Sequence, residues 1–328
     1  MQPKTLSVII PVFNEGEMIK QSIQRVGRIL CEAKIPHEII LVDDGSKDNT
    51  WQEIEKCAHS IPRVKAIKLS RNFGKESALC AGLDLANGDC CVCLDADMQH
   101  PPEVIPGMYD LWSNEGYDVV EGIKKSRGKE SLGYKISAGL FYRLLRITSG
   151  IDLNNASDFK LLDRKALDAW KSMPEKQTFF RGMSSWIGFS RAQIEFEVAE
   201  RETGTSKWSF VSLLKLAVQG ITSFTAAPLY ASAFLGFGLL VAFFFLLCQT
   251  LIMKMLGYAA GGFTTVIALQ LVIGGTLMMS VGVIGIYIEK IYEEVKARPR
   301  YIVKQLVEHA TIITPNEVML PISENDTK

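Results

Sequence analysis

The chain has 328 residues, and its 36 basic and 36 acidic side chains give a formal net charge of +0. A balanced charge provides no overall positive field for binding nucleic acid. Hydrophobic residues make up 48% of the sequence and the mean hydropathy is +0.13, which is high for a soluble protein of this size. The apolar excess lies between residues 228 and 288, so the composition predicts a soluble part followed by a membrane part.

The soluble part is expected in the cytosol. Residues 1–4 are not followed by the long apolar run of a signal peptide, and the apolar stretch 6–12 is too short to span a bilayer. Cys90, Cys91 and Cys93 lie in one apolar run without a matching Cys or His pair at usable spacing. Buried, reduced thiols are therefore favoured over a zinc site.

Apolar runs alternate with segments of helical periodicity through the first part of the chain. Strands are expected over 6–11, 37–42, 64–69 and 90–94, and helices over 15–33, from 48 or 50, over 76–87 and from 102. This alternation predicts an α/β fold with a doubly wound, mostly parallel sheet. Further on, the pattern predicts a strand over 116–122, one helical segment over 171–189 and an edge strand over 193–198.

The four predicted strands all end in polar or charged residues. These are Asn14 and Glu15, Asp43 and Asp44, Arg71, and Asp95 and Asp97. Parallel strands bring their carboxyl ends to one edge, where ligands bind in open α/β sheets, so we expect these side chains to converge. Two carboxylates one residue apart suit a hard cation, and a hard cation suits a diphosphate. Taken alone, the pair Asp95 and Asp97 is equally compatible with a solvated turn.

A basic run over 124–129 is followed by an amphipathic stretch over 132–147. It is either a solvated loop with a surface helix or a cationic patch for a phosphate or anionic lipid headgroups. Asp158 then stands directly before another apolar segment.

Residues 207–227 form an apolar, Trp-led stretch that is typical of an interfacial helix, although a helix packed on the soluble part is the alternative. Two charge-free spans follow at about 229–253 and 263–288, each long enough to cross a core of ~30 Å. Five basic residues follow the second span, against Lys254 alone in the intervening loop: Lys290, Lys296, Arg298, Arg300 and Lys304. The positive-inside rule therefore predicts that both ends of this hairpin face the cytoplasm.

The ordered motifs resemble those of family-2 glycosyltransferases with a GT-A fold. They are VIIPVFNE at 8–15, VDDGS at 42–46, RNFG at 71–74 and DADMQ at 95–99. Two further motifs narrow the resemblance: RETGTSK at 201–207 before the two spans and RPRY at 298–301 after them. With these, the chain is similar to polyprenyl-phosphate glycosyltransferases of the bactoprenol glucosyltransferase type. That type is itself similar to dolichol-phosphate-mannose synthases. This implies a cytoplasmic GT-A catalytic domain over 1–206, an interfacial region over 207–227, two transmembrane helices over 228–288, and a cytoplasmic basic segment and tail over 289–328.

The resemblance implies inverting transfer of a sugar, glucose first, from a UDP-sugar to undecaprenyl phosphate at the cytoplasmic face of a bacterial inner membrane. The lipid-linked sugar would serve surface glycans such as O-antigen. Mg²⁺ or Mn²⁺ is implied as cofactor, membrane lipids as partners, and a homo-oligomer, a tetramer, as the assembly. A GDP-mannose donor, a UDP-N-acetylglucosamine donor and a membrane-anchored, non-enzymatic nucleotide-sugar scaffold remain alternatives. A processive polysaccharide synthase is disfavoured because the chain lacks a Gln-x-x-Arg-Trp motif.

Roles for single residues follow from the same resemblance. The nucleoside pocket would be lined by Pro11, Phe13, Glu15 and Asp44, with Asp44 reading the uracil. Arg71 would also help to hold the donor. Arg201 and Lys207 would contact the phosphates of the donor. The metal–diphosphate site would comprise Asp95, Asp97 and Gln99. The catalytic candidates are Asp97 and Asp158, the latter beside the sugar and the acceptor. The lipid phosphate has three open candidates: Lys124, Arg127 and Lys135.

The acceptor chemistry bears on Asp158. A phosphate monoester has a second pKa near ~6 and is mostly ionised at cytosolic pH. It needs less help from a base than a sugar hydroxyl does. We therefore expect Asp158 to act as much by positioning as by removing a proton.

Overall fold

The structure is a computed structural model that describes residues 4–125, 157–173, 175, 179–197, 222, 225–257, 262–308 and 311–313. Contacts within the chain divide it into two units. The first, here called the sheet unit, contains the described residues up to 197 and those from 298 onward. The second, the hairpin unit, contains the described residues between 222 and 297.

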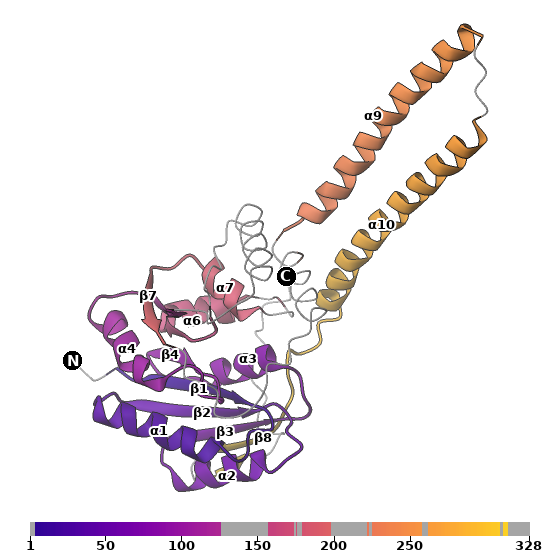
Figure 1. Ribbon diagram of the computed structural model, residues 1–328. Coiled ribbons are helices and arrows are strands. Elements are labelled where there is room, and N and C mark those ends of the chain that lie inside the picture. The colour runs from indigo at the N-terminus through magenta and orange to yellow at the C-terminus, as the bar shows by residue number, and fades with distance from the viewer. Residues whose placement is uncertain are drawn as a thin grey trace, which may run out of the picture. The chain divides into compact units, whose positions relative to one another are not determined.

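Four parallel strands form the middle of the sheet, and each is followed by a helix (Figure 1). In chain order these elements are β1 (Leu6–Val12), α1 (Ile19–Glu32), β2 (His37–Asp43), α2 (Thr50–Ser60), β3 (Val64–Leu69), α3 (Lys75–Leu85), β4 (Cys90–Cys93), the 3₁₀ turn η1 (Pro102–Val104) and α4 (Ile105–Ser113). All residues of β1 and β4 are buried, as expected for parallel strands covered on both faces. Helices α1 and α2 lie on one face and α3 on the other.

The sheet continues on both sides of this parallel centre. The remaining elements of the sheet unit are β5 (Val119–Lys124), β6 (Lys160–Asp163), α6 (Arg164–Lys171), α7 (Phe180–Trp186), β7 (Arg191–Phe196), β8 (Val303–Glu308) and β9 (Thr311–Ile313). The nine described strands lie in the order β7-β5-β6-β4-β1-β2-β3-β8-β9. Strand β6 runs antiparallel to β4 and to β5, and β8 runs antiparallel to β3. The predicted α/β fold with a mostly parallel sheet is confirmed.

The expected single helical segment over 171–189 is wrong. Helix α6 ends at Lys171, and α7 begins only at Phe180. The sequence has Pro174 in this interval, and proline removes a backbone donor and disfavours a continuous helix.

Strand β8 lies in the segment that the sequence pattern assigns to a basic region and tail. It pairs with β3, and just before it the Ser70 N–H donates to the Ile302 carbonyl at 2.9 Å. The Tyr301 hydroxyl donates to Asp84 at 2.7 Å, and the Arg300 guanidinium donates to the carbonyls of Met173 and Glu175. The chain therefore returns after the hairpin to complete the edge of the sheet.

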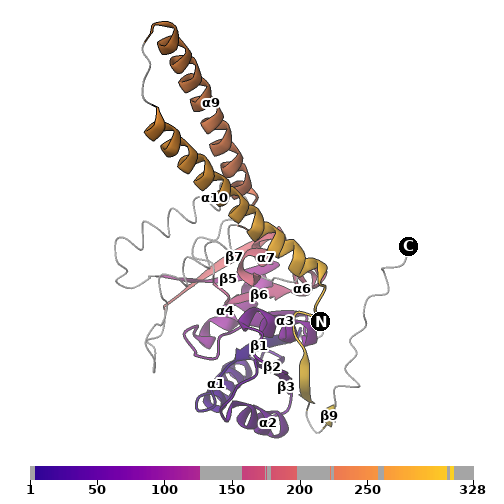
Figure 2. The ribbon, with the colours of Figure 1, turned by 90° about the vertical axis from the view of Figure 1, so that its right-hand side faces the viewer.

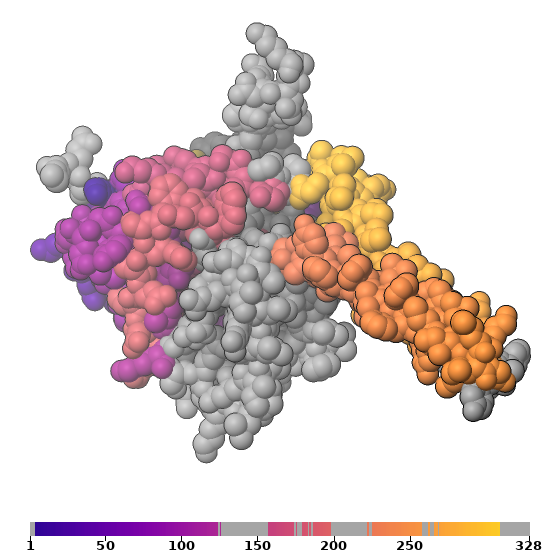
Figure 3. All heavy atoms as spheres, turned by 90° about the horizontal axis from the view of Figure 1, so that it is seen from above, coloured from indigo at the N-terminus to yellow at the C-terminus, as the bar shows by residue number. Residues whose placement is uncertain are grey.

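The hairpin unit contains α9 (Ala227–Met255) and α10 (Phe263–Val295), which lie side by side (Figure 2) and are drawn with their side chains in orange to yellow in Figure 3. Their apolar segments have mean hydropathies of 2.4 and 2.1, and none of the residues in those segments is buried. The Tyr287 hydroxyl donates to the Thr225 carbonyl at 2.7 Å. At ~1.5 Å rise per residue, both helices exceed the ~30 Å of a bilayer core, so they are candidate transmembrane spans.

Other predicted segments lie outside the described residues. These are most of the interfacial stretch 207–227, the amphipathic stretch 132–147 and the tail from 315.

Helix α3 approaches the sheet closely through Gly82. A Cβ placed at Gly82 would overlap Cγ2 of Ile9 on β1 and lie 3.2 Å from Cγ2 of Val42 on β2. We predict that Gly82→Ala destabilises the protein by about 1–3 kcal/mol, because β-branched side chains in a packed core have little room to move. Thermal or chemical unfolding of the purified full chain measures this.

Gly27→Ala on α1 is the matched control, since nothing lies within 4 Å of a Cβ placed there. It should be neutral or stabilise by about 0.5–1 kcal/mol, as glycine is a poor helix former. Equal stability of the two variants would contradict the close approach of α3.

Candidate functional site

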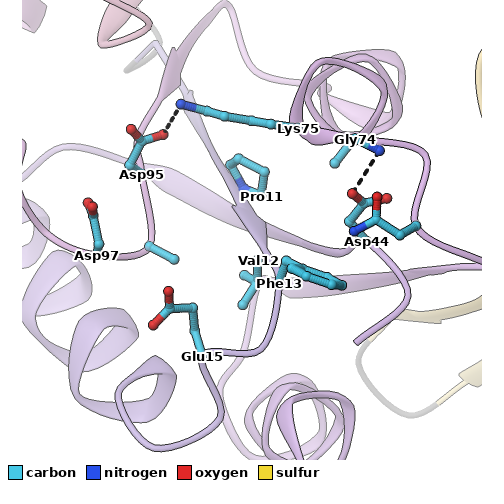
Figure 4. A pocket seen from close by; sticks show the side chains of 12 residues that line it. Pro11, Val12, Phe13, Glu15, Asp44, Gly74, Lys75, Asp95 and Asp97 are labelled. Atoms are coloured by element: carbon cyan, nitrogen blue, oxygen red, sulfur yellow. Dashed lines mark hydrogen bonds and ion pairs between the residues drawn. The ribbon is translucent and has the colours of Figure 1, made fainter. Parts of the chain in front are cut away.

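A pocket of about 290 Å³ lies where the four parallel strands end (Figure 4). Its lining comes from all four strand ends: Pro11, Phe13 and Glu15 at the end of β1, Asp44 after β2, Asn72 and Gly74 in the β3–α3 loop with Lys75 at the start of α3, and Asp95 and Asp97 after β4. The predicted convergence of polar strand ends is therefore found. No single strand supplies the site, so its geometry depends on the pairing of the whole parallel centre.

The loops after β2 and β3 are joined through Asp44. Its two carboxylate oxygens accept hydrogen bonds from the Phe73 N–H at 2.7 Å and the Gly74 N–H at 2.9 Å. Burial raises the pKa of the Asp44 carboxyl more than these two bonds lower it. Gly45 has a φ of +69°, and a Cβ there would lie 2.5 Å from the Arg71 carbonyl carbon, so only glycine allows the two loops to come this close.

One side of the pocket is acidic. The carboxylates of Glu15 and Asp97 lie on the same side of it (Figure 4). Burial raises the pKa of Glu15, and the negative charges of Asp97 and Asp48 raise it further. A cation placed among these carboxylates would relieve that repulsion.

The donor set suits a hard divalent cation, because carboxylate oxygens are its preferred ligands. Within the described residues, no group of three His, Cys, Asp or Glu side chains is arranged to hold a metal ion. Asp95 and Asp97 supply two carboxylates, so an ion held by them would take its remaining ligands from water and from a bound diphosphate, as Mg²⁺ commonly does.

Positive charge lies beside Asp95 at the pocket (Figure 4). Lys75 Nζ lies 2.6 Å from Asp95 Oδ1 and 2.8 Å from Asp158 Oδ2. Arg181 donates to both oxygens of Asp158 at 2.9 Å. Burial alone would raise the pKa of the Asp158 carboxyl, but Arg181 and Lys75 together hold it well below its usual range. Burial would lower the pKa of Lys75, but Asp95 and Asp158 raise it.

Buried charges from two directions hold α7, which carries Arg181. The fully buried Lys160 Nζ donates to Glu121 Oε1 and to Ser184 Oγ, both at 2.9 Å, and to the Arg181 carbonyl at 3.3 Å. From α3, Glu76 Oε2 accepts a hydrogen bond from the Phe180 N–H at 2.8 Å. These contacts fix the first turn of α7 and therefore the position of Arg181.

Of the predicted site residues whose side chains the structure describes, most lie together. Pro11, Phe13, Glu15, Asp44, Asp95 and Asp97 line the pocket, and Asp158 is joined to it through Lys75.

Two predicted residues stand apart from the lining. The Arg71 guanidinium lies over the Phe73 ring, 4.5 Å from its centroid. The Gln99 N–H donates to Asp97 Oδ1 at 3.2 Å. Arg127, Lys135, Arg201, Lys207 and the side chain of Lys124 lie outside the described residues.

Sequence reasoning missed Lys75, Glu76 and Arg181 as site residues. Lys75 had a signal, since it directly follows Gly74 at the end of a predicted parallel strand. Arg181 had none, because its contact with Asp158 depends on how α7 packs against β6.

The buried pair Lys160–Glu121 gives a prediction on stability. Lys160→Met should lower the free energy of unfolding by about 3–5 kcal/mol, because it leaves the Glu121 carboxylate buried with its main partner removed. Chemical denaturation measures the change. Lys165→Met, at an exposed position on α6, is the control and should stay within about 0.5 kcal/mol of wild type. A Lys160→Met protein as stable as the control would show that the pair contributes nothing.

Glu76 gives a prediction on pH. Burial and the charge of Asp158 raise its pKa from 4.5 to about 7, against the lowering effects of the Phe180 hydrogen bond, Lys75 and Arg181. The folded state thus retains a proton that the unfolded chain loses, so this contribution to stability is lost as pH rises through about 7. Between pH ~5 and ~8, the melting temperature of wild type should fall relative to that of Glu76→Gln.

Melting curves across this pH range provide the measurement. Glu53→Gln, at a partly exposed position on α2, is the control and should follow wild type. Parallel profiles for wild type and Glu76→Gln would contradict the raised pKa.

Comparison with known proteins gives consistent matches. Residues 7–170 match the family Glycosyl transferase family 2. An uncharacterized glycosyltransferase of Synechocystis sp. is 39% identical over 306 residues, which are 92% of this chain and 95% of that protein. A prophage-derived bactoprenol glucosyl transferase of Shigella flexneri is 36% identical over 302 residues, which are 92% and 97% of the two chains.

Among solved structures, a glucosyl-3-phosphoglycerate synthase from Mycobacterium tuberculosis, in complex with Mn²⁺, UDP and glucosyl-3-phosphoglycerate, matches with a TM-score of 0.47. It is 21% identical, and the match covers 67% of this chain and 78% of that one. The family match and the two relatives, which extend over most of this chain, agree with the motifs at the four strand ends. The chain therefore belongs to glycosyl transferase family 2 and is a glycosyltransferase.

Proposed function

We propose that this glycosyltransferase moves glucose from UDP-glucose to a polyprenyl phosphate, undecaprenyl phosphate, at the cytoplasmic face of a bacterial inner membrane. The observation that carries the proposal is the similarity over 92% of the chain to relatives named bactoprenol glucosyl transferase. That similarity extends over nearly the whole length of the chain and is therefore not confined to the residues that form the pocket.

The nucleoside would bind against β1 and β2. Phe13 is 41% exposed at the pocket, which is unusual for a large apolar side chain and suits stacking against a base. Asp44 is held rigidly by the amides of Phe73 and Gly74. Each carboxylate oxygen has a second acceptor site, so Asp44 can still accept the N–H of a uracil.

The diphosphate would bind at the end of β4. Asp95 and Asp97 would hold Mg²⁺ or Mn²⁺, and the Gln99 side chain would support the same site. The bound ion would act as a Lewis acid that neutralises charge on the diphosphate leaving group. Arg71, Arg201 and Lys207 would add positive charge around the donor.

The acceptor phosphate would arrive near Asp158. Both oxygens of Asp158 are engaged with Arg181 and Lys75, and a carboxylate held ionised in this way is a poor base. Asp158 therefore acts by holding two cations where the phosphates meet. The acceptor is already ionised, so its oxygen attacks the anomeric carbon directly and inverts the configuration. Lys124, Arg127 and Lys135 are the candidates for binding the lipid phosphate.

The membrane arrangement completes the proposal. The catalytic domain (1–206) and both chain ends lie in the cytoplasm, α9 and α10 span the membrane, and residues 207–227 lie at its surface. This places the catalytic domain on the side where nucleotide sugars are made and keeps the lipid acceptor close to it.

Asp97→Asn tests the function. The full chain in detergent or nanodiscs is given a radiolabelled sugar donor and undecaprenyl phosphate with Mn²⁺ or Mg²⁺, and the extracted lipid product is identified. Asp97→Asn should reduce formation of the lipid-linked sugar by about 100-fold or more, because even outer-shell partners of a metal cost about 10- to 100-fold.

Asp110→Asn, an exposed change of the same chemistry on α4, is the control and should keep wild-type activity. UDP-N-acetylglucosamine and GDP-mannose are offered in parallel with UDP-glucose. Turnover of another donor alone would overturn the assignment of glucose, and no lipid product from any donor would overturn the proposed function.

A further inference from the structure

The Lys75 ammonium lies beside the Asp95 carboxylate, where a divalent cation would also bind. Lys75 Nζ lies 2.6 Å from Asp95 Oδ1, and the dashed line in Figure 4 marks this contact. The same ammonium lies 2.8 Å from Asp158 Oδ2. It therefore joins a carboxylate at the end of β4 to one that precedes β6.

The position of Lys75 is set by the backbone. Lys75 is the first residue of α3, directly after the loop whose amides are held by Asp44. Its side chain is 41% exposed and lines the pocket, so the ammonium can leave Asp95 without unfolding its surroundings. Asp95 is 25% exposed, and its other oxygen lies 3.5 Å from His100 Nδ1.

We propose that Lys75, as the counter-ion of Asp95 and Asp158, competes with the divalent cation for Asp95. When the ion takes Asp95, the ammonium stays on Asp158 and turns to the diphosphate. The negative charge of the diphosphate stabilises both the Lys75 ammonium and the divalent cation. The divalent cation therefore binds weakly in the absence of the nucleotide and tightly in its presence. This inference rests on the metal site in the proposed function.

Removal of the Lys75 charge should strengthen metal binding at this site. Without nucleotide, Lys75→Met should bind Mn²⁺ more tightly than wild type, by about 5-fold or more, which is a typical coupling between two ligands that share a site. Addition of UDP should tighten Mn²⁺ binding strongly in wild type and less in Lys75→Met. Lys75→Gln should behave as Lys75→Met does, and Lys75→Arg, which keeps the charge, should remain within about 2-fold of wild type.

The measurement is titration of the full chain in detergent with Mn²⁺, followed by electron paramagnetic resonance of the free ion, with and without UDP. Lys56→Met is the matched control: it removes the same charge from an exposed pair with Glu53 on α2 and should leave Mn²⁺ affinity unchanged. Melting temperatures show that each variant is folded. In an Asp95→Asn background, Lys75→Met should bring no gain in affinity, because the carboxylate competed for is absent.

The Mn²⁺ affinities of the Lys75 and Asp97 variants distinguish the role of Lys75 from the assignment of the metal site. Tighter Mn²⁺ binding in Lys75→Met, lost in the Asp95→Asn background, supports it. Unchanged or weaker Mn²⁺ binding in Lys75→Met and Lys75→Gln, while Asp97→Asn weakens binding, overturns the role of Lys75 and leaves the metal site intact. If Asp97→Asn does not weaken Mn²⁺ binding, both the metal assignment and the role of Lys75 are overturned.

Discussion

The parallel pairing of β1 with β2 and β4, and of β2 with β3, is the constraint on which the site depends. Val12 pairs with Asp43 and Asp43 with Lys68, so β1, β2 and β3 end at nearly the same level of the sheet, while β4 ends opposite Ile9 and the chain continues from there to the same edge. Each helical crossover returns the chain to the amino-terminal end of the next strand, so every strand places a new loop at the carboxyl-terminal edge of the sheet. Four loops that are distant in sequence thus meet around one pocket. Asp44 then locks two of them together with backbone hydrogen bonds, which orders the start of α3.

Charge balance governs the rest of the site. A buried carboxylate requires partners, and here the partners are shared: Asp158 holds Lys75 and Arg181, and Lys75 also holds Asp95. A second, deeper ion pair between Lys160 and Glu121 supports the first turn of α7. The network has two layers, one accessible to ligands and one that positions it. Glu15 and Asp97 lie on the acidic side of the pocket, where the negative charge of Asp97 raises the pKa of Glu15.

The features that could be predicted from sequence are those with a local signal. Apolar runs mark the parallel strands, and the edge rule then places Asp44, Asp95 and Asp97 together without any knowledge of packing. Arg181 escapes such reasoning because its contact with Asp158 depends on the antiparallel insertion of β6 and on a helix that begins only at Phe180. Strand β8 escapes it because its partner β3 lies far back in the chain; the nearby contact between Tyr301 and Asp84 joins residues 217 positions apart. The periodicity of apolar residues along the sequence does not indicate a strand pairing over that separation.

The position of β8 in the chain has a consequence for biosynthesis. The edge of β3 stays open until the ribosome has made both apolar helices, since β8 follows them. An open strand edge is a template for aggregation, and lysines on such an edge are a common protection. Strand β3 carries Lys65 and Lys68, and in the finished protein Lys65 lies 3.5 Å from Glu308 on β8. Lys65 also lies 3.1 Å from Glu38 on β2, so one lysine at the β3 edge contacts carboxylates on both neighbouring strands. The sheet is therefore completed only after the hairpin has been synthesised.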